Sequence, residues 1–83
     1  TSQAAEINGW VKSDACWVVE KPSTDATVVG IIKRKAAVTV EDAGNGWAKI
    51  VFAPVRNPKT GKFMECTGCY IQMKDITTKL GQW

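Results

Sequence analysis

The cysteines are the side chains of this chain that offer the most chemistry. Cys16 stands alone, whereas Cys66 and Cys69 form the spacing CTGC. In a chain of 83 residues with a small core, three cysteines favour one disulfide in an oxidising compartment and one remaining thiol. Two other interpretations stay open: buried free cysteines, and redox or metal chemistry. The last is the weakest, because a zinc site needs about four ligands, histidine is missing, and no helical pattern follows CTGC.

The lack of histidine also argues against catalysis. The commonest general base is absent, so Ser-His-Asp and Cys-His sites cannot be built. The segment KTG at 59–61 has no Ser-x-x-Lys partner, and Gly61 with Lys62 lacks the earlier glycine of a phosphate loop. Glu41 and Asp42 are adjacent in a turn, where their carboxylates point apart. We therefore expect no enzymatic activity, no cofactor and no metal.

The tryptophans favour binding instead. In the stretch ACWVV at 15–19, Cys16 and Val18 share one face, so Trp17 points outward if those two face the core. An outward tryptophan either covers an edge or lines a ligand groove. Trp47 follows a turn, and it either packs over that loop or lines the same groove. Shallow aromatic grooves suit extended peptides of low conformational entropy.

The elements that would position these side chains are short strands. No window shows the helical apolar period, and β-rich runs recur between turn residues. The sequence predicts a lead-in strand at GWVK, a bulge or bend at Gly30, a turn at 41–46 and a long connection at 53–62. The predicted strands lie at 15–19, 27–33, 37–40, 47–52 and within 63–73. Five or six such strands suggest an all-β sandwich or, more readily, a small barrel, because closure removes sheet edges.

Composition fits one globular domain at 8–83 after a flexible segment at 1–7. Hydrophobic residues make up 45% and charged residues 23%, and no apolar run has a membrane-spanning length. No secretory signal pattern is visible at the start. The net charge of +3 gathers partly at Lys33–Lys35 and in the 53–62 connection. This charge forms either a solvated surface or a weak anion site.

The tripeptide Asn-Gly-Trp occurs twice, at 8–10 and 45–47. Beyond the pentapeptides NGWVK and NGWAK the two regions hardly agree, so the chain is not a duplication. Asn45-Gly46 is typical of a hairpin turn with positive φ. We expect replacement of Gly46 to damage the fold and replacement of Gly9 to be tolerated.

The order of the motifs resembles bacterial Src-homology-3-like domains, which are common in cell-wall enzymes. The matching pieces are CWVVEKPSTDATVVGIIKRKAAVTV, then GNGWAKI, then TGCYI, over about residues 10–76. This chain departs from the family pattern at Ala36, at Cys69 and in the expanded connection 53–62. These departures fall near the family's ligand groove.

The resemblance implies a five-stranded barrel whose first and last strands are neighbours. That arrangement would bring Cys16 near Cys69 or Cys66, and a bridge closing about 50 residues would stabilise the fold by roughly 4 kcal/mol. It further implies a secreted or cell-envelope module, monomeric and non-catalytic, that binds peptidoglycan peptides or glycine-containing peptides. Such a module targets an attached or associated wall-degrading enzyme such as a lysozyme or peptidase. The candidate ligand-binding residues are Trp17, Glu20, Thr24, Asp25, Trp47 and Tyr70.

Two other functions stay open. A protein-interaction or inhibitor domain would dock through the 53–62 connection, with Arg56 as a contact. A small nucleic-acid-binding barrel would use Lys33–Lys35 and the basic connection, with affinity falling steeply with salt. The weak net charge and the expected disulfide argue against nucleic acid as the partner.

Overall fold

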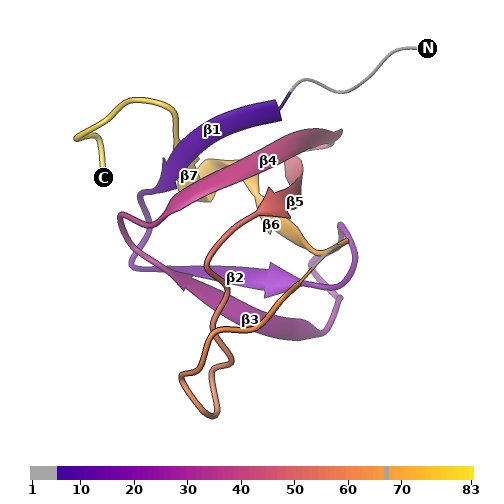
Figure 1. The fold of residues 1–83 in the computed structure, drawn as a ribbon. Helices are drawn as coiled ribbons and strands as arrows, with labels where there is room; N and C mark the ends of the chain where they lie inside the picture. The colour runs from indigo at the N-terminus through magenta and orange to yellow at the C-terminus, as the bar shows by residue number, and fades with distance from the viewer. Residues whose placement is uncertain (1–5, 67) are drawn as a thin grey trace.

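A computed structural model of the protein describes residues 6–66 and 68–83, and these form one antiparallel sheet (Figure 1). There is no α-helix in the described ranges, and a single 3₁₀ turn, η1 (Met73–Asp75), interrupts the strands. The seven strands are β1 (Glu6–Val11), β2 (Ala15–Val19), β3 (Val28–Lys33), β4 (Ala37–Gly44), β5 (Trp47–Phe52), β6 (Tyr70–Gln72) and β7 (Ile76–Thr77). The expected all-β class is therefore confirmed.

The strands lie in the order β3-β2-β6-β5-β4-β1-β7, and all pairs are antiparallel. In Figure 1, β1 and β4 lie on one side of the molecule and β2 and β3 on the other, so the sheet folds back on itself. The first strand pairs with the last, as Trp10 with Thr77 and Val11 with Ile76. In the described part of the chain, the edge strands β3 and β7 do not pair with each other, so the sheet is not closed.

Buried and exposed side chains alternate along the strands, and this alternation determines which residues form the core. In β2, Cys16 and Val18 are fully buried while Trp17 points to solvent, and in β5 Ala48 and Ile50 are buried on either side of exposed Lys49. β-Branched residues suit such a half-buried pleated surface. The buried residues form one cluster inside the folded sheet: Val11, Cys16, Val18, Ile32, Val38, Val40, Ala48, Ile50, Val55, Cys69, Ile71 and Ile76.

Gly30 serves close packing rather than a break in its strand. It pairs in register with Val18, and the register shift of this ladder lies beyond it, at Val18/Val19. A Cβ placed on Gly30 would lie 2.4 Å from a methyl of Val55 and 3.1 Å from the carbonyl oxygen of Arg56. The missing side chain therefore makes room for the chain that follows β5 to cross over β3.

That crossing chain forms a hairpin-like arm, defined here as residues 53–65, which extends from the body below β3 in Figure 1. Arg56 bridges both Ile31 and Phe63. The amide of Ile31 donates to the carbonyl of Arg56 at 2.9 Å, and the amide of Arg56 donates back at 2.8 Å. The predicted long connection is thus an ordered element anchored on the outer edge of β3.

Three strand boundaries differ from the sequence prediction. β4 continues to Gly44, so Glu41 and Asp42 are paired with β5 and do not lie in the turn predicted at 41–46. Glu6 and Ile7 pair with β4, so β1 begins inside the segment expected to be flexible, and residues 1–5 lie outside the described residues. The predicted strand within 63–73 is restricted to Tyr70–Gln72, because the preceding residues first form the arm and then a disulfide turn.

Candidate functional site

A shallow groove crosses the outer face of the sheet where β2, β6 and β5 lie side by side. It consists of two adjoining hollows of about 220 Å³ and 300 Å³, which share Thr24, Trp47 and Gln72. The first hollow reaches Trp17 and Asp75, and the second reaches Lys74 and the turn of Asn45 and Gly46. The complete lining is Trp17, Val19, Ser23, Thr24, Ala26, Val28, Asn45, Gly46, Trp47, Gln72, Lys74 and Asp75.

The two tryptophans reach the groove for different local reasons. Trp17 is 55% exposed, because its neighbours Cys16 and Val18 occupy the inward positions of β2. Trp47 opens β5 directly after a tight turn and pairs across the sheet with Gln72. Its ring is half-buried. The structure therefore brings together two of the three side chains that the sequence analysis proposed for aromatic stacking, Trp17 and Trp47, but not Tyr70.

The polar loop between β2 and β3 contributes one of its three candidates. The amide of Ala26 donates to the carbonyl of Ser23 at 3.1 Å, and the amide of Asp25 donates to the Ser23 hydroxyl at 3.2 Å. This turn places Thr24 in the groove wall. Glu20 and Asp25 are exposed and do not line the groove.

Tyr70 lies on the same face of the sheet but beside the groove. It pairs with Lys49 of β5, two residues from the Trp47–Gln72 pair, and with Val19 of β2. Side chains two residues apart on a strand share a face, so Tyr70 lies on the same face as Gln72, but it lines neither hollow. It is half-buried.

Two groove residues were not predicted from the sequence. Gln72 faces Trp47 only because β6 pairs with β5 in this register. Asp75 comes from η1, and one of its carboxylate oxygens accepts a hydrogen bond from the Ser13 hydroxyl at 2.7 Å. η1 therefore lines one end of the groove and places two opposite charges there, those of Lys74 and Asp75.

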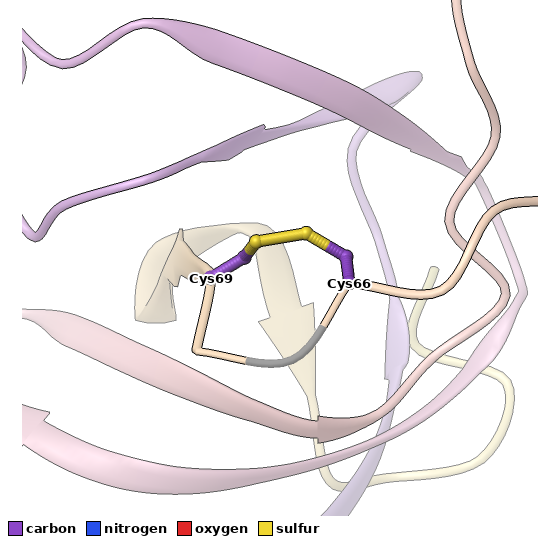
Figure 2. The surroundings of a disulfide bond; sticks show 2 residues. All are labelled: Cys66 and Cys69. Atoms are coloured by element: carbon purple, nitrogen blue, oxygen red, sulfur yellow. A yellow bond between two sulfur atoms is a disulfide. The ribbon is translucent and has the colours of Figure 1, made fainter.

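The cysteine pairing differs from the one implied by the family resemblance. Cys66 and Cys69 form a disulfide (Figure 2). Cys16 is free and buried. The expected bridge from Cys16 is wrong, because the Cα atoms of Cys66 and Cys69 lie 5.9 Å apart, a distance that a disulfide spans. Burial, with a smaller contribution from the Asp75 carboxylate, raises the pKa of the Cys16 thiol to about 12.

Comparisons of this chain with protein-family models, with curated proteins and with solved structures found no match. Among the described residues, none of the helical segments is long and apolar enough to cross a membrane.

Proposed function

We propose that the protein is a non-catalytic peptide-binding module that holds an extended peptide in the groove between Trp17 and Trp47. The observation that carries this proposal is that two tryptophans from β2 and β5 line one continuous groove. Exposed aromatic side chains around a shallow concavity provide contact area at a low entropic cost. A Src-homology-3-like barrel is the fold that we propose for this module, and the pairing of β1 with β7 agrees with it.

The chemistry of the groove suits a peptide that is short of apolar side chains. Trp17 and Trp47 stack on peptide planes, while the Gln72 amide and the Thr24 hydroxyl exchange hydrogen bonds with backbone groups. The Asp75 carboxylate attracts a free amine, and Lys74 attracts a free carboxylate. Peptidoglycan stem peptides and glycine bridges have these properties, and they are the ligands that the family resemblance implies.

The expected affinity is low, which suits a targeting role. A peptide poor in side chains buries little apolar area, so we expect a Kd on the order of micromolar to millimolar. Such a module acts by raising the local concentration of an attached or associated wall-degrading enzyme. The Cys66–Cys69 disulfide agrees with the proposed location, secreted or in the cell envelope.

The test is retention on purified peptidoglycan, followed by amide-shift mapping with oligoglycine and with a stem peptide. We expect saturable shifts at Trp17, Trp47 and Gln72, and at least roughly tenfold weaker retention for Trp17→Ala. Gln72→Ala removes a polar contact with little effect on packing, and it should weaken binding less. Phe52→Ser is the matched control, since Phe52 is exposed outside the groove.

Failure of the wild-type chain to be retained, together with no shifts around the groove, overturns the proposal. Equal loss of retention in Phe52→Ser and Trp17→Ala overturns the placement of the ligand. Glu20→Ala and Asp25→Ala should bind like wild type, because neither side chain lines the groove.

A further inference from the structure

A second concave surface lies apart from the peptide groove, between the end of β5 and the returning half of the arm. This recess encloses about 540 Å³, and its apolar wall includes Phe52, Pro54, Phe63 and Met64. Glu65 is the one charged residue in its lining, so any cations that meet a partner lie on the rim. It shares no lining residue with the groove. Phe52 is 73% exposed and Phe63 is 63% exposed. Two exposed phenylalanines in one hollow are the kind of apolar patch that marks an interaction site.

Hydrogen bonds within the arm hold the framework of the recess. The amide of Met64 donates to the carbonyl of Val55 at 2.9 Å, and Val55 itself is buried against Gly30. Further out, the amide of Asn57 donates to the carbonyl of Lys62 at 2.8 Å. Within the turn, the Asn57 side-chain oxygen accepts from the amide of Lys59 at 2.8 Å. A surface that needs no ordering on binding loses less conformational entropy when a partner docks.

The arm also carries a net positive charge. It carries Arg56, Lys59 and Lys62 against Glu65, so its net charge is 3 − 1 = +2, out of +3 for the whole protein. The Arg56 guanidinium lies 4.2 Å from the centre of the Phe63 ring and donates to the carbonyl of Gly61 at 3.2 Å. A cation is therefore fixed beside the aromatic wall of the recess.

We propose that this recess is a docking site for an acidic segment of another protein, which inserts one apolar side chain between Phe52 and Phe63. Acidic residues next to that apolar anchor then meet Arg56, Lys59 and Lys62. Interfaces of this kind combine a desolvated apolar centre with a charged rim that guides association. The proposal does not depend on the peptide groove, because the two surfaces have no residue in common.

The position of the phenylalanines favours a protein segment over a lipid surface. Phe63 pairs with Arg56 at the base of the arm, and Arg56 is held against β3. Lys59 lies in the turn at the far end. A flat bilayer would meet the lysine-bearing tip first, whereas insertion into headgroups needs the aromatic rings at the leading surface. A protein side chain reaches into the recess from the open side.

The experiment is selection of a phage-displayed library of short random peptides on the full chain, followed by affinity measurement and amide-shift mapping. We expect enriched peptides to carry an aromatic residue or leucine beside aspartate and glutamate, with shifts at Phe52, Phe63 and Met64. The double variant Lys59→Glu/Lys62→Glu should bind these peptides roughly tenfold more weakly at low salt. Trp17→Ala should bind them like wild type.

Phe52→Ser provides a second variant that leaves the Arg56–Phe63 stacking in place. It should also weaken binding. Three results would overturn the proposal: no enrichment, enrichment of basic or uncharged peptides, or peptides whose binding is lost in Trp17→Ala and kept in Phe52→Ser. Co-sedimentation with phosphatidylserine-containing vesicles that depends on Phe52, without peptide enrichment, would assign the recess to lipid and overturn the proposal as well.

Discussion

The two Asn-Gly-Trp segments have the same sequence and opposite backbone conformations. Asn45 and Gly46 have φ values of 55° and 82° and form the tip of the β4–β5 hairpin, where a Cβ on Gly46 would contact nothing. The first copy, Asn8-Gly9-Trp10, lies extended within β1 and pairs with β4. A Cβ on Gly9 would lie 2.7 Å from the carbonyl oxygen of Thr77.

The same residue is thus needed for two different reasons. At Gly46 the requirement is conformational, since a side chain disfavours positive φ. At Gly9 the requirement is spatial, because β7 passes directly over the glycine. The structure reverses the expectation that Gly9 tolerates replacement better than Gly46, because a local motif does not show which distant strand will lie on it.

The largest loss of stability is expected for Gly9→Ala. The new methyl group would collide with backbone rather than with a flexible side chain, so β1 and β7 must separate. We expect a loss of about 2–3 kcal/mol in the free energy of unfolding, measured by urea denaturation. Stability within error of wild type would show that β7 does not require a glycine at position 9.

Substitutions of Trp10 and Trp47 should affect different properties, stability in the first case and peptide binding in the second. Trp10 packs against Trp83, with ring centres 6.1 Å apart and planes inclined by 56°. Trp10→Ala should therefore cost about 1–2 kcal/mol of stability and leave peptidoglycan retention unchanged. Trp47→Ala should lower retention by a larger factor than Trp10→Ala does. Denaturation and retention measured on both variants check this, and identical profiles would contradict it.

Gly46→Ala should have a smaller effect than Gly9→Ala. The turn keeps its open surroundings, and only the positive φ of 82° becomes unfavourable. The expected loss is about 1 kcal/mol. A matched control is Gly44→Ala, which also has positive φ and open space at the same hairpin. Thermal denaturation of the three glycine variants gives the ranking directly.

The smallest loss of stability is expected for Asn8→Ala. The Asn8 side-chain oxygen accepts a hydrogen bond from the Thr39 hydroxyl at 2.9 Å on the exposed face. Water replaces that partner readily, so the loss should be about 0.5 kcal/mol or less. A double-mutant cycle with Thr39→Val isolates the pair, and a coupling above about 1 kcal/mol would show that this hydrogen bond is not weakened by solvent.

Much of the strand pattern could be predicted from the sequence. Buried Cys16 and Val18, with exposed Trp17 between them, follow from simple alternation, and so does the convergence of Trp17 and Trp47 on an outer face. Phe52 breaks the alternation that Ala48 and Ile50 follow. It lies where β5 leaves the core and enters the arm, next to a register shift between Thr39 and Val40.

Gln72 and Asp75 could not be predicted, because their place in the groove depends on strand register and on η1. The cysteine pairing could not be predicted either. In the chain-entropy model a bridge from Cys16 would stabilise the fold more, because it closes a longer loop, but its thiol is enclosed by the core while Cys66 and Cys69 are already close.

The burial of Cys16 affects whether its thiol can exchange with the Cys66–Cys69 disulfide. Disulfide exchange needs a thiolate, and burial raises the pKa of the Cys16 thiol to about 12, so the thiol form dominates at neutral pH. The thiol is also closed off from solvent, although it shares the core with Cys69. We therefore expect exchange between Cys16 and the native cross-link to be slow while the sheet is intact.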